Sequence, residues 1–122
     1  MKDDLSVYRN YRGEPPPAIE QTKFLLSSGA NELIACGDYV AAAKQKLKVA
    51  RICRSQGKDR DRHHLETSAY ELIQKAAREK GQYMEAAKAL HDWASRLRAD
   101  GFERDAYLMD TTACQLGQHS RY

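Results

Sequence analysis

The sequence predicts an all-α protein of about five antiparallel helices, arranged as tandem helix hairpins. The first observation is an internal repeat, since residues 37–74 align without a gap to residues 81–118 and match at 14 of 38 positions. A fixed period of roughly 20–50 residues is typical of repeat proteins, in which each unit buries its apolar face against a neighbour. The second is composition: the 122 residues include only seven Gly and three Pro, and 42% are hydrophobic, which favours helices over sheets or disorder. A compact helical bundle is the alternative arrangement of the same helices.

Length and composition bound the rest of the architecture. The chain is long enough for one domain with a modest core. No apolar run approaches the roughly 18 residues that span a bilayer, and the polar start Met1-Lys2-Asp3-Asp4 is unlike a secretory signal. We therefore expect a cytoplasmic protein that does not bind membranes. The three cysteines, Cys36, Cys53 and Cys114, are expected to be buried free thiols in a reducing compartment.

The first predicted helix opens the domain, which we assign to residues 18–118. Residues 1–17 are predicted to be a tail that ends in the stiff brace Pro15-Pro16-Pro17, and residues 119–122 a second tail. From Ala18 to about residue 36 apolar residues recur at helical spacing. Gly37 is placed to end this helix, and Asp38 to cap the next one.

The second helix, about 38–56, and the fourth, about 82–99, occupy equivalent positions in the two copies of the repeat. Each places small residues on one face at 100° per residue, so that a neighbouring helix can approach closely. Lys46 lies in this stripe where the second copy has Leu90, and we expect it to snorkel to solvent or to face a groove. The third helix, about 61–79, follows Gly57.

The fifth helix, about 103–117, belongs to the second copy and is equivalent to the third helix of the first copy. At the start of both helices an Arg-Asp pair recurs, as Arg60-Asp61 and Arg104-Asp105. We expect the aspartates to interact with the positive end of the helix dipole, and the arginines to bond back to the preceding helix end.

The second and fourth helices open with Gly37-Asp38-Tyr39 followed by Ala42, and with Gly81-Gln82-Tyr83 followed by Ala86. These openings resemble the tetratricopeptide repeat, in which a Gly ends one helix, an aromatic residue two positions later packs between helices, and a small residue follows. The period of 44 residues exceeds the family's usual 34, and the closing proline is absent, so longer helices are implied. The resemblance implies right-handed stacking of hairpins whose first helices line a concave surface for a peptide or helix of another protein. The structural repeat positions are Gly37, Tyr39, Ala42, Gly81, Tyr83, Ala86 and Trp93.

Charge is concentrated in residues 44–64, which hold eight basic and two acidic residues, a net charge of +6. The basic residues of the second helix are expected on one side, opposite the apolar stripe. Such a surface suits an acidic protein ligand or the phosphates of a nucleic acid, and a solvated helix face is the structural alternative. The segment lacks interleaved aromatic residues for base stacking. The candidate partner-binding residues are Lys44, Lys46, Lys48, Arg51, Arg54, Lys58, Arg60, Arg62, His63, His64 and Tyr70.

Catalytic and metal-binding patterns are not found. His63 and His64 are adjacent, so their side chains point about 100° apart on a helix, and no Cys, Asp or Glu stands at a spacing that completes a site. No nucleophile, base and orienting group can be placed together from the sequence. We therefore expect no enzyme activity, no cofactor and no metal.

These observations predict a non-enzymatic protein–protein interaction module, such as an adaptor, chaperone or regulator. The expected groove is formed by the first, third and fifth helices, with Lys46, Arg60 and His64 attracting acidic groups and with Tyr70 and Trp93 as walls. The alternatives are a small basic nucleic-acid-binding subunit of a larger complex and an inhibitor that acts by occlusion. Two and a half repeats leave the last helix uncovered, so we also expect a homodimer, the tail or a partner on that flank.

Overall fold

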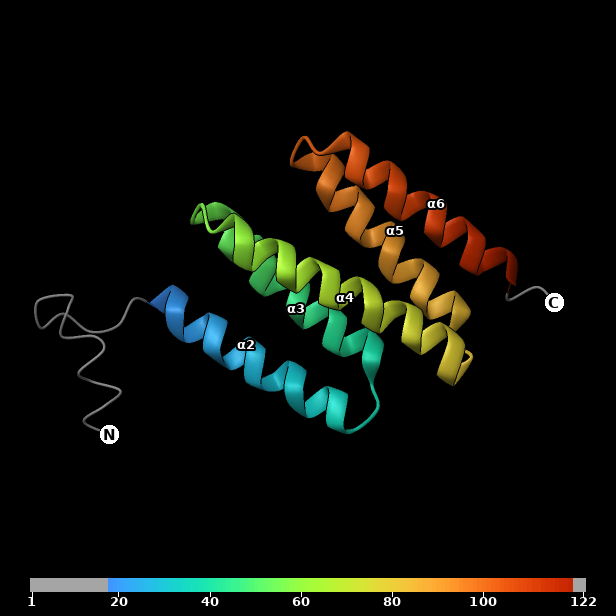
Figure 1. Cartoon of the computed structure of the whole chain (residues 1–122), viewed down its shortest axis with the longest axis horizontal. Helices are drawn as coiled ribbons and strands as arrows, with labels where there is room; N and C mark the ends of the chain where they lie inside the picture. The colour runs from blue at the N-terminus through green and yellow to red at the C-terminus, as the bar shows by residue number, and fades with distance from the viewer. Residues whose placement is uncertain (1–17, 120–122) are drawn as a thin grey trace, which may run out of the picture.

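In the computed structural model, residues 18–119 are described, and they form five α-helices with no strand among them (Figure 1). The all-α prediction is therefore confirmed. The predicted tail at residues 1–17 lies outside the described residues, and so do residues 120–122 of the tail predicted at 119–122, whereas His119 is the last residue of α6. The helices are α2 (Ala18–Ala35), α3 (Tyr39–Ser55), α4 (Asp59–Lys80), α5 (Tyr83–Ala99) and α6 (Glu103–His119).

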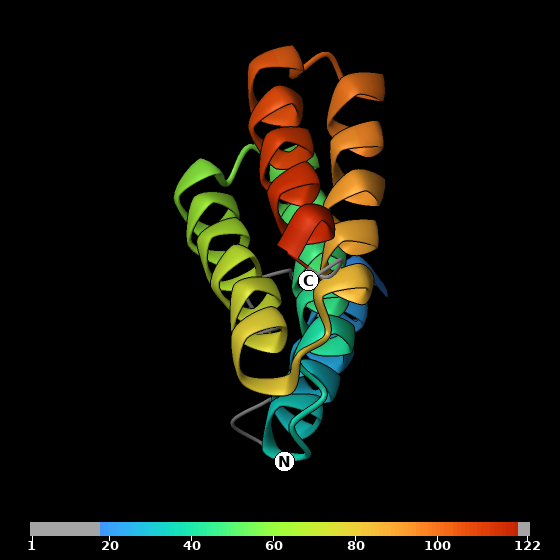
Figure 2. The same ribbon diagram turned by 90° about the vertical axis from the view of Figure 1, so that its right-hand side faces the viewer.

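The helices pack in pairs. The most extensive contacts join α3 to α4 and α5 to α6, and α2 packs against α3. The two hairpins meet where α5 lies against α4 and, more lightly, against α3. Figure 2 looks along this row from the end at which the chain finishes, with α5 and α6 in front of α2 and α3. This arrangement is compatible with a helical repeat.

The internal repeat is reproduced at the level of backbone geometry. Helices α3 and α5 begin and end 44 residues apart, and α4 and α6 begin 44 residues apart. The glycines that end the helices recur with left-handed backbone, φ 81° at Gly37 and 68° at Gly81, and φ 75° at Gly57 and 91° at Gly101. Because this conformation strongly favours glycine, the same helix ends are specified in both copies. Asp38 accepts a hydrogen bond from the backbone N–H of Ala41 at 3.4 Å, which confirms its predicted capping role.

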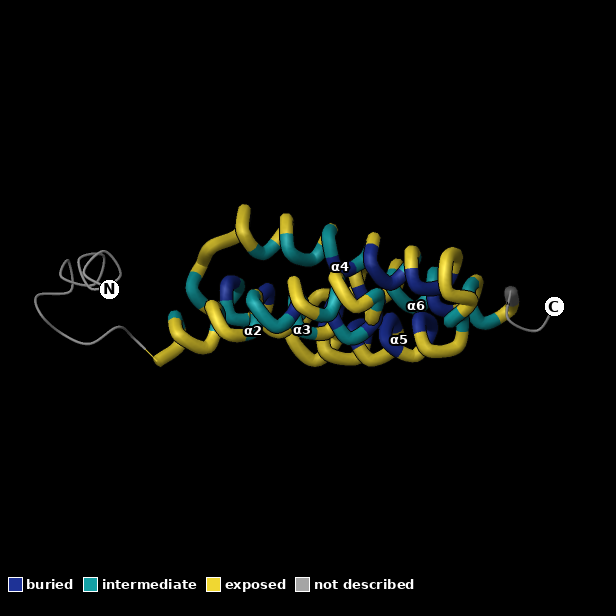
Figure 3. The backbone as a smooth tube through the Cα atoms, turned by 90° about the horizontal axis from the view of Figure 1, so that it is seen from below, coloured by how far each residue is buried: buried dark blue, intermediate teal, exposed yellow. Residues whose placement is uncertain are grey.

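The core lies between the helices, where the buried residues are found (Figure 3). It consists largely of small residues. Its largest fully buried side chains are Ile73, Leu90 and Cys53. Tyr39 and Tyr83 are partly buried and pack against this core, as the repeat resemblance implies. The alanines that are buried at equivalent positions of both copies are Ala42, Ala43, Ala50 and Ala69 in the first copy and Ala86, Ala87, Ala94 and Ala113 in the second.

The three cysteines are free, as predicted, but their predicted burial is wrong at two of the three positions. Cys53 is buried, whereas Cys36 and Cys114 are exposed. Cys36 lies in the turn after α2, and Cys114 lies on α6. None of the described helices is long and apolar enough to cross a membrane.

Candidate protein-binding pocket

A pocket of about 250 Å³ opens between the two hairpins, where side chains of α3 and α5 face each other. Its apolar lining consists of Leu47, Ala89, Trp93 and Leu97. Around these residues stand charged side chains of both signs. They are Lys44, Lys48, Arg51 and Arg54 of α3, Glu66 of α4, Asp92 and Arg96 of α5, and Asp100 after α5.

The spacing of the α3 residues explains their place in the pocket. Residues 44, 48, 51 and 54 follow one another at intervals of three or four, and residue 47 lies three positions after 44 and four before 51, so all five share one side of the helix. This side faces α5, and Leu47 belongs to it. The buried residues Ala42, Val49 and Cys53 lie on the other side of α3, so the basic residues are opposite the apolar stripe of their own helix. What the sequence did not indicate is the apolar surface that the second hairpin supplies beside them.

Two of the basic residues join the hairpins to each other. The Arg54 Nη2 donates to Glu66 Oε2 at 2.9 Å, and the guanidinium lies 3.7 Å from the centre of the Phe102 ring. The Arg51 Nη2 donates to Asp100 Oδ1 at 3.2 Å. Arg54 thus contacts its own hairpin and Phe102, the last residue of the α5–α6 turn.

The remaining basic residues of the pocket are available to a ligand. Within the described part of the chain, Lys44, Lys48 and Arg96 form no ion pair, and neither does Asp92. With five basic and three acidic side chains, the lining carries a net charge of +2. The pocket therefore combines an apolar surface with an excess of positive charge.

Most of the other predicted binding residues lie outside this pocket. Lys46 is partly buried, and Lys58, Arg60, His63 and His64 are exposed at the α3–α4 turn or early in α4. Arg62 Nη1 donates to Glu66 Oε1 at 2.7 Å, so it supports the same carboxylate as Arg54.

Tyr70 and Trp93, expected as walls of one groove, line different surfaces. The hydroxyl of Tyr70 shares a hydrogen bond of 3.0 Å with Thr112 Oγ1 and so links α4 to α6. Tyr70 also lines a separate shallow depression along α4, whereas Trp93 is buried at the α3–α5 pocket. The pocket that includes Trp93 is thus formed mainly by α3 and α5, and not by the first, third and fifth helices as expected.

The recurring Arg-Asp pairs agree with only half of their predicted role. Asp61 and Asp105 lie in the first turns of α4 and α6, where the helix dipole favours a negative charge. Arg60 and Arg104 are exposed, and no hydrogen bond from either to a preceding helix end is found among the residues described.

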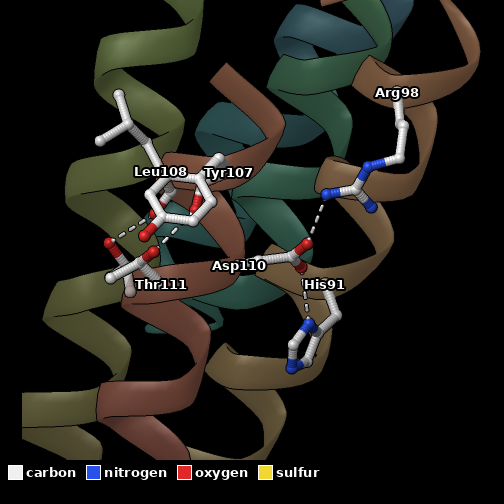
Figure 4. A network of polar contacts seen from close by, with 7 residues as sticks. His91, Arg98, Tyr107, Leu108, Asp110 and Thr111 are labelled. Carbon is white, nitrogen blue, oxygen red and sulfur yellow. Dashed lines mark hydrogen bonds and ion pairs between the residues drawn. The ribbon is translucent and has the colours of Figure 1, made fainter. Parts of the chain in front are cut away.

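A second contact recurs in both copies between an arginine and a carboxylate, and the alignment did not reveal it because only identical residues were matched. Arg98 is the equivalent of Arg54, and its Nη2 donates to Asp110 Oδ2 at 2.7 Å, with Asp110 standing where the first copy has Glu66. His91 Nδ1 lies 2.8 Å from the other carboxylate oxygen, so Asp110 lies between the two (Figure 4). The hydrogen bond from Arg98, and then that from His91, lowers the pKa of Asp110. Counting Glu and Asp as one class in the alignment reveals this pair.

The described residues contain no group of three or more side chains suited to hold a metal ion. Comparison of the chain with family models, curated proteins and solved structures finds no match. The evidence that the two hairpins are equivalent comes from the chain itself: the internal repeat, the shared helix bounds and the glycine conformations.

Proposed function

We propose that this protein is a non-enzymatic interaction module, an extended relative of the tetratricopeptide repeats, that binds an acidic segment of a partner protein in the pocket between α3 and α5. The observation that carries the proposal is the buried Trp93 beside cations that have no internal ion pair. In this role the protein acts as an adaptor, chaperone or regulator in the cytoplasm.

The apolar surface of the pocket suits an anchor side chain. Binding energy in protein interfaces is concentrated at a few well-packed sites, in which Trp and Arg are enriched. A volume of about 250 Å³ is below the roughly 300–1,000 Å³ of pockets that hold small molecules. One large apolar side chain of a peptide or helix fits such a space better than a cofactor does.

The charges around the pocket favour an acidic residue next to that anchor. Lys44 and Lys48 are exposed on one side of α3, one helical turn apart, and Arg96 lies across the pocket on α5. Carboxylates on the ligand would gain from these cations, mainly in association rate and specificity. Nucleic acid is less well supported, because Glu66, Asp92 and Asp100 also line the pocket and would repel phosphates.

The test is affinity purification with the wild-type chain and a variant carrying Lys44→Glu and Lys48→Glu. We expect the wild type to retain a protein partner that this variant loses. The matched control carries Lys58→Glu and Arg60→Glu, which change the net charge equally outside the pocket, and it should retain the partner.

Trp93 is the only tryptophan of the chain, so its fluorescence reports directly on the pocket. Titration with a peptide that joins glutamates to one leucine or phenylalanine should change the emission of the wild type and of the control variant. Equal binding by both charge variants would contradict the proposal. Salt-sensitive binding of an oligonucleotide without any protein partner would favour the nucleic-acid alternative.

A further inference from the structure

The repeat allows the outer face of the second hairpin to be compared with the same face of the first. On the first hairpin Val40 is 6% exposed, whereas its equivalent on α5, Met84, is 65% exposed. Leu47 is partly buried against the core, whereas its equivalent, His91, is exposed. The face that the second hairpin covers on the first is therefore open on the second.

The open face has the form of a groove along α5 and α6, with a volume of about 530 Å³. Its lining includes Ala87 and Ala113, whose equivalents in the first copy are the fully buried Ala43 and Ala69. Met84 and Cys114 are exposed beside them. Because the floor is made of small residues, a helix can approach the backbone of both α5 and α6 closely.

The first copy also shows which chemistry completes such a face. The Arg54 guanidinium is covered by the ring of Phe102, which lies three residues after the end of α5, the first helix of the covering hairpin. Its equivalent, Arg98, holds Asp110 as Arg54 holds Glu66, but its side chain is 45% exposed compared with 18% for Arg54. No aromatic ring lies over Arg98 among the described residues.

We propose that the α5–α6 groove is a docking surface for an amphipathic helix of a partner protein, with an aromatic residue shortly after the helix C-terminus that stacks on Arg98. The groove continues the interface that already joins the two hairpins. A second copy of this chain is a poorer occupant, because its own α5 already buries Leu90 and Trp93 within its fold. This surface is distinct from the α3–α5 pocket, and its occupancy is independent of the function proposed above.

The chain itself supplies a probe, since residues 82–102 contain α5 and the aromatic residue that follows it. A fluorescently labelled peptide of this sequence should bind the full chain with a saturable change in anisotropy. Met84→Glu in the chain should weaken binding at least tenfold. The control is Leu25→Glu, which replaces a side chain that is 68% exposed on α2 and should leave the affinity unchanged. Circular dichroism checks that both variants keep the helical content of the wild type.

The aromatic contact is tested by a second pair of changes. A peptide with Phe102→Ala should bind the wild-type chain about threefold more weakly, as expected for loss of a partly exposed cation–π contact. The same peptide change should have no effect on a chain with Arg98→Gln. Absence of saturable binding, or equal affinity for the Met84→Glu and wild-type chains, would overturn the proposal. A dimer in sedimentation that Met84→Glu dissociates would overturn the choice of occupant.

Discussion

Replacing Arg54 with alanine removes the side chain that contacts both hairpins at their junction. The guanidinium bonds Glu66 of α4 at 2.9 Å and lies over the Phe102 ring at 3.7 Å. We expect this variant to be less stable than the wild type and to loosen the α3–α5 pocket, since Arg54 also lines it.

The size of the effect follows from these contacts. The side chains of Arg54 and Glu66 are each 18% exposed, so solvent screens the pair less than a surface pair, and its loss costs about 1 kcal/mol. Loss of the stacking adds about 0.5–1 kcal/mol. Glu66 keeps its hydrogen bond from Arg62 at 2.7 Å, so the larger penalty for an isolated buried charge does not apply. The total of about 2 kcal/mol corresponds to a fall in Tm of roughly 8 °C for a chain of this length.

The assay is thermal and urea unfolding followed by circular dichroism, with Arg98→Ala as the matched control. Arg98 makes the equivalent carboxylate contact without a ring above it, so its replacement should lower the Tm by less. A double-mutant cycle between Arg54→Ala and Phe102→Leu should give a coupling of about 0.5–1 kcal/mol. Equal losses for Arg54→Ala and Arg98→Ala, together with zero coupling, would refute the role of Arg54 at the junction.

Three further predictions concern other parts of the fold. Leu90→Ala should lower the free energy of unfolding in urea by about 2–5 kcal/mol, because this side chain is fully buried; a loss below 1 kcal/mol would contradict that packing. Gly81→Ala should cost about 1 kcal/mol because φ is 68° there, whereas Gly117→Ala, inside α6 with open space at the Cβ position, should stabilise by about 0.5–1 kcal/mol; thermal melts that rank the two variants the other way would count against these backbone assignments. The hydrogen bond from Arg98 lowers the pKa of Asp110 below its ordinary 3.8, so its contribution to stability is complete above that value and is lost as the pH falls through the lower folded pKa; urea midpoints between pH 6 and 2 should therefore fall less in Asp110→Asn than in the wild type.

The site was only partly predictable from the sequence. Lys44, Lys48, Arg51 and Arg54 were recognised as one side of a helix, because periodicity within a helix is a local property. The sequence did not show that α5 faces this side of α3, because the packing of the hairpins decides which helices face each other. Trp93 was expected as a wall of the groove, but the sequence did not indicate that it meets the basic side of α3.

The sequence by itself determined the helices and their ends. The 44-residue repeat, with Gly37 and Gly81 at matching positions, encodes the same turns twice, because only residues that tolerate a left-handed backbone end helices in this way. Tertiary structure alone decided which surfaces are covered. Met84 is exposed, whereas its equivalent, Val40, is buried. The reason is that a further hairpin follows the first copy, and none follows the second among the described residues. Burial is a property of neighbours, and equivalent sequence positions do not have equivalent neighbours at the end of a stack.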